Sequence, residues 1–399
     1  MTYIPHERAK QNENRAKTFH ANLTYILTAK KQLSKQDISG LEGKGMTIMQ
    51  LPEVLLERIF EEEYKDLLKT KLRDWIPYDK IDLKWLSANI NIEAINILKD
   101  ADPDNLDWNK LAANISAYDI LSNPVNRVRL NKYKKELSGN SDKDVVKFLQ
   151  DNKDLVNLKI LSGNKGAGEW LLTYTQEPWL LEIKELSRNP GAINLIREFF
   201  LKDPYSPFIN WNFLSENPKA IKLLEQNKPK INWSSLSKNP KAIELLRDKR
   251  EEEKGLSSTI LGKLNQYQKI DWGNLSSNPK AIELLSEKIE EEERLSTNEL
   301  AILKYHEKID WKLLSANPGA IKLLEEALSN NTNKSKINWD LLSANPGAIK
   351  LLKKYQGEIN FKYLSMNPSI FVLDRWHTGF SPPPFAQKES SSPKVIQSE

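Results

Sequence analysis

A sixteen-residue string recurs along this 399-residue chain and limits the possible folds more than any other feature. Its clearest copies are INWNFLSENPKAIKLL at 209–224, INWSSLSKNPKAIELL at 231–246, IDWGNLSSNPKAIELL at 270–285, IDWKLLSANPGAIKLL at 309–324 and INWDLLSANPGAIKLL at 337–352. Weaker copies extend the series to eleven units, marked by Leu86, Leu111, Leu137, Leu161, Leu186, Leu214, Leu236, Leu275, Leu314, Leu342 and Leu364. The array therefore covers about residues 81–373, and a recurrence of this kind is the signature of a repeat architecture.

Each copy of the string predicts two short helices. The Asp or Asn before the aromatic residue, such as Asn210, is a good N-cap for a first helix. The aromatic residue and the leucine three positions later, such as Trp211 and Leu214, share one face of that helix. Asn217 and Pro218 predict the cap and first position of a second helix, whose apolar stripe is the A-I-x-L-L stretch.

A helix–turn–helix unit of this size is too small to bury its own apolar stripe, so neighbouring units must stack to complete a core. We therefore expect an all-α protein, an α-solenoid of about eleven short helix–turn–helix repeats. One repeat position carries an aromatic residue that we expect to pack in this core. Its members are Trp108, Trp211, Trp233, Trp272, Trp311, Trp339 and Phe361.

Two kinds of unit depart from the pattern. The units at Leu137 and Leu161 lack the proline and the tryptophan, so we expect them to be less regular or to pack differently. In the C-terminal half, two units carry insertions that we predict to be helical and to form a ridge. In the second insertion, residues 296–299 (STNE) are typical of a capping box, and the acidic run 290–293 is predicted to extend the preceding helix into solvent.

The two ends of the chain differ from the array in composition. Residues 1–45 hold eight Lys+Arg and four Asp+Glu, which is +4 of the chain's formal charge of +5. We interpret them as a basic N-terminal arm and linker, either solvated or binding nucleic acid or capsid. Residues 377–399 have the Ser/Pro bias of a disordered tail.

Composition argues against most catalytic chemistry. The chain has no cysteine, and its four histidines, His6, His20, His306 and His377, stand in no metal-binding or catalytic spacing. We expect no enzyme activity, no catalytic residue, no metal and no cofactor. Nucleic-acid binding is not expected either, because the array has little net charge. No apolar run approaches the length of a membrane span, so we expect a protein that is not secreted and crosses no membrane.

Residues 46–80 are predicted to form an N-terminal helical cap, and part of this segment resembles the opening of an F-box. The string LPEVLLERIF carries that resemblance, and the matching positions are Leu51, Pro52, Leu55, Leu56, Ile59 and Phe60. The resemblance implies docking on a Skp-type adaptor of a cullin ubiquitin ligase. A helix that only covers the first repeat needs the same apolar spacing, so both interpretations remain open.

The consensus I-[DN]-W-x-x-L-S-x-N-P-x-A-I-x-L-L resembles the tandem repeat of proteins from giant, nucleocytoplasmic large DNA viruses, over roughly residues 72–373. The resemblance implies a viral origin and a repeat architecture, and it carries over no site residue. We expect a non-enzymatic protein–protein interaction scaffold, a minor capsid or cement component that binds capsid or other virion proteins in the virion or host cytoplasm. The alternative is an F-box-like adaptor that recruits host proteins to a cullin ubiquitin ligase.

Overall fold

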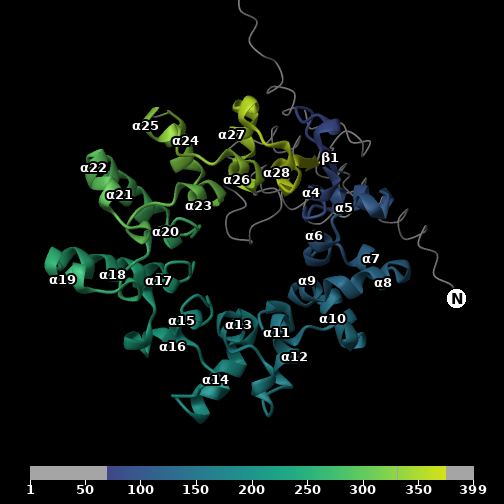
Figure 1. Cartoon of the computed structure of the whole chain (residues 1–399), viewed down its shortest axis with the longest axis horizontal. Coiled ribbons are helices and arrows are strands. Elements are labelled where there is room, and N and C mark those ends of the chain that lie inside the picture. The colour runs from purple at the N-terminus through teal and green to yellow at the C-terminus, as the bar shows by residue number, and fades with distance from the viewer. Residues whose placement is uncertain (1–69, 330, 374–399) are drawn as a thin grey trace, which may run out of the picture. The chain divides into compact units, whose positions relative to one another are not determined.

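The computed structural model describes residues 70–329 and 331–373, and this part of the chain is mostly helical, as the repeats predict (Figure 1). The chain divides into two compact units. One spans Asp74–Ile370 and contains the described helices. The other combines residues 1–73 with residues 371–399, and its described part is an antiparallel pair of strands, β1 (Thr70–Leu72) and β2 (Phe371–Leu373). Neither strand was expected from the sequence.

In nine of the eleven repeats an Asp or Asn caps the first helix, as predicted. The side-chain oxygen of Asn210, for example, accepts a hydrogen bond from the Phe213 amide at 3.3 Å. The two exceptions are the helices that follow Tyr133 and Glu182, neither of which makes a side-chain cap bond. The first helices are α4 (Leu83–Leu86), α6 (Trp108–Ala113), α9 (Lys134–Gly139), α11 (Leu158–Leu161), α13 (Ile183–Arg188), α15 (Trp211–Leu214), α17 (Trp233–Leu236), α20 (Trp272–Leu275), α23 (Trp311–Ala316), α26 (Trp339–Ala344) and α28 (Phe361–Ser365).

The second helix of the consensus repeats begins later than predicted, at the isoleucine three residues after the proline. The Ala220 amide donates to the Asn217 carbonyl at 3.0 Å, which closes a tight turn before α16 starts at Ile221. The second helices are α5 (Ile92–Asp100), α7 (Tyr118–Leu121), α10 (Lys143–Asp151), α12 (Gly168–Leu172), α14 (Ile193–Lys202), α16 (Ile221–Glu225), α18 (Ile243–Gly255), α21 (Ile282–Glu293), α24 (Ile321–Ser329) and α27 (Ile349–Lys354).

Short helices fill the connections between these elements. Four are α-helical: α8 (Arg127–Leu130), α19 (Ser258–Lys263), α22 (Thr297–Ile302) and α25 (Asn331–Lys334). The others are single 3-10 turns: η2 (Tyr78–Lys80), η3 (Pro103–Asn105), η4 (Pro124–Asn126), η5 (Asn131–Tyr133), η6 (Lys153–Leu155), η7 (Lys165–Ala167), η8 (Pro178–Leu180), η9 (Pro190–Ala192), η10 (Lys228–Lys230), η11 (Gln266–Gln268), η12 (Tyr305–Glu307), η13 (Pro346–Ala348), η14 (Gln356–Glu358) and η15 (Pro368–Ile370).

The two insertions are helical, as predicted. They lengthen α18 and α21 and add α19 and α22, and α22 starts with the predicted capping box between Ser296 and Glu299. Ion pairs join α18 to α21, among them Arg250 with Glu291. The prediction that the acidic run faces solvent is wrong for Glu292. Its side chain is buried because the carboxylate accepts the Ile309 amide, at 2.8 Å.

Adjacent repeats are joined by a ladder of asparagine side chains that the sequence did not reveal. The Nδ2 of Asn217 donates to two carbonyls of the preceding unit, those of Ser187 at 3.1 Å and Asn189 at 3.0 Å. The equivalent asparagine of every unit makes the same two bonds at 2.7–3.1 Å; these residues are Asn89, Asn114, Asn140, Asn164, Asn189, Asn217, Asn239, Asn278, Asn317, Asn345 and Asn367. We call this set the asparagine ladder.

A parallel set of bonds uses the serine of the repeat. The Oγ of Ser215 accepts the backbone amide of Asn232, the cap of the next first helix, at 3.1 Å, and nine other units do the same. The units at Leu137 and Leu161 keep both sets of bonds. Both units are thus joined to their neighbours by the same bonds as the regular units, because the joint uses the Asn and Ser that they retain rather than the Pro and Trp that they lack. The first helix of the Leu137 unit, α9, is less regular, since its N-cap Tyr133 makes no side-chain cap bond.

The ladder also joins the last unit to the first. The Nδ2 of Asn89 donates to the carbonyls of Ser365 and Asn367, at 2.9 and 3.0 Å, and the Asp82 amide donates to the Ser365 Oγ at 3.0 Å. Beside these bonds, the rings of Trp85 and Tyr363 lie 4.7 Å apart. We call this joint the seam. Within Asp74–Ile370 the eleven units thus follow one another along a closed path (Figure 1).

The core between the helices is made of the repeat leucines, which are fully buried at every marker position. The aromatic prediction holds in part, since Trp108 and Trp272 are buried whereas the equivalent residues of the other units are half-buried. Glycine after the Asn-Pro pair permits a close approach between units. A Cβ on Gly191 would lie 2.3 Å from the Lys165 carbonyl, so only glycine fits there.

Candidate binding surfaces

Five of the six repeat tryptophans face a cation supplied by the protein itself, whereas Trp339 packs against Tyr355. The Lys230 Nζ lies 4.5 Å from the centre of the Trp211 ring, and Lys336 lies 5.2 Å from that of Trp311. Trp272 is flanked by both Arg250 and Lys288. These cation–π contacts occupy ring faces that a stacked base or sugar would need. The repeat tryptophans are therefore packing residues, partly covered by Lys and Arg.

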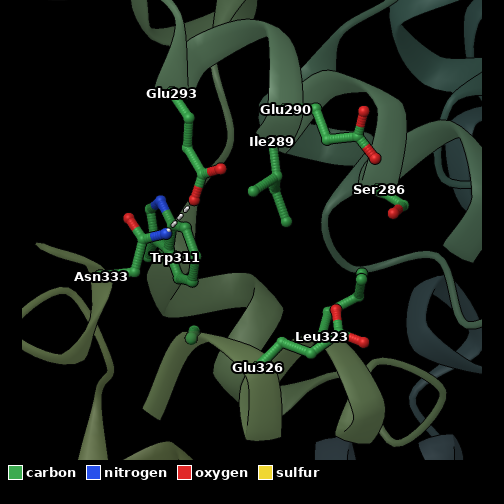
Figure 2. A pocket seen from close by; sticks show the side chains of 9 residues that line it. Ser286, Ile289, Glu290, Glu293, Trp311, Leu323, Glu326 and Asn333 are labelled. Atoms are coloured by element: carbon green, nitrogen blue, oxygen red, sulfur yellow. Dashed lines mark hydrogen bonds between the residues drawn. The ribbon is translucent and has the colours of Figure 1, made fainter. Parts of the chain in front are cut away.

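A cavity of about 230 Å³ lies between α21 and α24 and is lined by Trp311 and by glutamates (Figure 2). Figure 2 shows Asn333 beside Trp311, with its Nδ2 donating to Glu293 at 2.7 Å. Glu290 pairs with Arg294 at 3.4 Å, while Glu326 is exposed. Carboxylates beside an aromatic ring favour a cation over an anion. The described residues contain no group of His, Cys, Asp and Glu that could hold a metal ion.

Large apolar side chains are exposed in the segments that lead into the first helices of units five and six. Trp179 is 66% exposed and its neighbour Leu180 is 43% exposed, and both belong to η8. One unit further on, Leu201 is 81% and Tyr205 is 85% exposed. In the following segment, the Lys230 Nζ donates to the Pro204 carbonyl at 3.1 Å and lies 4.8 Å from the centre of the Tyr205 ring. We call Trp179, Leu180, Leu201 and Tyr205 the outer apolar patch.

Two buried glutamates occupy equivalent positions in the long helices α18 and α21. Glu253 accepts the Ile270 amide at 2.8 Å, as Glu292 accepts that of Ile309. Burial raises the pKa of both carboxyls above their ordinary value, although these backbone bonds and the nearby lysines act in the opposite direction. Each buried carboxyl thus bonds a backbone amide just before the first helix of the next unit.

This arrangement predicts a pH dependence of stability. Because burial raises the pKa of Glu253 and Glu292 in the folded protein, their favourable contribution to the free energy of unfolding is complete below the unfolded-state pKa of about 4.5. This contribution is lost as the pH rises through the folded-state pKa. In the variant E253Q/E292Q, we expect the free energy of unfolding to decline less than in the wild type between pH 4.5 and pH 7. Urea unfolding across this pH range measures the difference. The exposed pair E225Q/E244Q is the control, and equal slopes for both double variants would contradict the assignment.

The structure describes only some of the residues for which the sequence predicted a site. The F-box-like positions Leu51 to Phe60, the N-terminal arm and the tail lie outside the described residues, so those predictions stay as they are. Among the histidines, His306 is described, and its Nε2 lies 3.8 Å from the Glu307 carboxylate. No helix of the described part is long and apolar enough to cross a membrane. The outer apolar patch was missed because none of its residues belongs to the repeat consensus.

Comparison with known proteins gives no relative on which to base a function. No family model, no curated protein and no solved structure matches the chain.

Proposed function

We propose that this protein is a non-enzymatic protein–protein interaction scaffold, an α-solenoid whose eleven repeats present binding surfaces to another protein. The observation that carries the proposal is the outer apolar patch. Trp and Tyr are enriched at the energetic centres of protein interfaces, because they bury a large area at a small cost in conformational entropy. Four large apolar side chains exposed at adjacent repeats offer a partner protein apolar area to bury.

The nature of the partner is proposed from the sequence. The resemblance of the repeat to that of giant-virus proteins supports a structural or capsid-associated role, in which the scaffold binds capsid or other virion proteins. A rigid series of units, each fixed to the next by buried hydrogen bonds, suits a strut or cement. The F-box-like adaptor remains the alternative, in which residues 47–75 bind a Skp-type adaptor and the repeats bind the recruited target.

The proposal is tested by measuring partners and copy number together. Full-length tagged protein and the full-length variant W179A/Y205A would be used to capture proteins from infected or expressing cells, followed by quantitative mass spectrometry of the captured proteins and of purified particles. We expect virion proteins to be captured, with the variant binding at least about tenfold more weakly, as for the loss of aromatic hot spots.

The matched control is V125A/V128A, which shortens two equally exposed apolar side chains elsewhere in the array. If both variants capture virion proteins as well as the wild type does, the outer apolar patch is not the binding surface. Absence of the protein from particles, together with capture of a Skp-type adaptor and a cullin that requires residues 47–75, would replace the scaffold with the adaptor.

A further inference from the structure

The first helices carry a second surface, which is basic. The second position of these helices is an exposed lysine in five units on one side of the closed path: Lys362, Lys84, Lys135, Lys159 and Lys184. We call these residues the lysine arc. The seam places unit eleven next to unit one, so Lys362 and Lys84 belong to adjacent units although they are far apart in the sequence. The arc thus runs from unit eleven through the seam to unit five, interrupted at Asn109 of unit two.

Helix geometry places these lysines away from the core. Lys84 and the buried Leu86 are two residues apart, which is about 200° around an α-helix, so they lie on nearly opposite faces. The same spacing holds for Lys159 and Leu161. Figure 1 shows the first helices on the inner side of the closed path and the second helices outside. The lysines of the arc therefore belong to the inner helices of the Asp74–Ile370 unit and lie on the helix face opposite the buried leucine.

The lysine arc is not neutralised by the rest of the described chain. Its five lysines form no ion pair with the described residues, although Lys110 nearby is paired with Asp107. In the remaining units after unit five, the equivalent positions are Asn212, the buried Ser234 and Gly273, and the exposed Lys312 and Asp340. Lysines of adjacent units at this position therefore occur only in the arc, whereas Lys312 stands between units that carry Gly273 and Asp340.

Apolar side chains accompany three of the lysines. Trp85, Ile160 and Tyr363 each follow a lysine of the arc and are only partly covered. An acidic partner that also carries apolar side chains would therefore meet both kinds of group at the same repeat. Complementary charge of this kind sets the specificity and the rate of association.

We propose that the lysine arc binds an acidic protein segment in which glutamates or aspartates alternate with apolar residues. No residue of the arc belongs to the outer apolar patch, so the inference goes beyond the proposed function and does not depend on it. A nucleic acid fits the arc less well. The Trp85 ring already contacts Tyr363 and lies 4.9 Å from the Lys110 Nζ, so its faces are occupied where a base would have to stack.

The test uses the full-length chain and defined probes. A fluorescent peptide of five Glu-Glu-Leu repeats would be titrated with wild-type protein, with the arc variant K84E/K159E/K184E, and with the control K219E/K241E/K280E. The control changes the net charge equally at exposed lysines that follow the Asn-Pro pair. We expect saturable binding by the wild type and the control, at least about tenfold weaker binding by the arc variant, and an affinity that falls as salt is raised.

Two results would overturn the inference: no binding of the peptide to the wild type, or equal loss of binding in both triple variants. Single-stranded oligothymidine of 20 nucleotides is the competing probe. If it binds more tightly than the peptide and loses affinity in the arc variant, the arc is a nucleic-acid site instead. Circular dichroism melting curves that coincide for the three proteins show that the comparison is between folded chains.

Discussion

Replacing Asn278 by aspartate is expected to lower the free energy of unfolding by about 3–5 kcal/mol, since each buried carbonyl left without a donor costs about 1–3 kcal/mol. The Asn278 Nδ2 donates to the carbonyls of Ser237 and Asn239, at 3.0 and 3.1 Å, and the side chain is fully buried. An aspartate keeps the oxygen that accepts the Lys280 amide but presents a second oxygen to the two carbonyls. Urea unfolding at pH 7 measures the loss.

Two controls make this result specific to the ladder. Lowering the pH protonates the new aspartate and restores one donor, so part of the lost stability of N278D should return in acid. Asn212 is exposed and outside the ladder, so N212D should leave the free energy of unfolding within about 0.5 kcal/mol of wild type. If N278D is as stable as N212D, the asparagine ladder does not hold the units together.

The same change at the seam is expected to be as costly as it is inside the array. N89D removes the donor from the carbonyls of Ser365 and Asn367, which lie 276 and 278 residues away along the chain. We expect a loss of about 3–5 kcal/mol, because the joint between the last and first units is built like every other joint. Unfolding curves of N89D and N278D, measured side by side, compare the two joints directly.

An open array would behave differently under this test. If units one and eleven did not touch, the Asn89 amide would be in water, and its replacement would cost no more than about 0.5 kcal/mol. Hydrogen exchange adds a second measurement. In a closed path N89D should increase exchange in both α4 and α28, whereas in an open array only the units next to residue 89 would respond.

Local features of the fold followed from the sequence because they depend on neighbouring residues. Asn210 predicted the start of α15, and residues 296–299 predicted the capping box of α22, since a cap bonds amides two or three positions away. The buried leucines followed from their spacing in the same way. The late start of the second helix was missed because the turn after Asn217 is fixed by how that side chain also reaches the preceding unit.

The binding surfaces depended on tertiary structure to different degrees. The exposure of Trp179 and Tyr205 had no sequence signal, because the repeat pattern identifies residues that are buried, not those that are left uncovered. The sequence shows that the lysines of the arc share one position of the repeat. It does not reveal that Lys362 and Lys84 belong to adjacent units. Glu292 was misjudged since an acidic run on a helix usually faces water, and only the Ile309 amide makes its burial possible.

The sequence by itself determined that the chain is built of eleven helical repeat units with a shared apolar core, because periodicity fixes which face of each helix is apolar. Only the tertiary structure decided that the units form a closed path. Closure depends on the sum of the small rotations between successive units, and each rotation is set by close contacts such as that of Gly191 with Lys165. The asparagine ladder is continuous because that sum brings Asn89 within hydrogen-bond distance of the last unit.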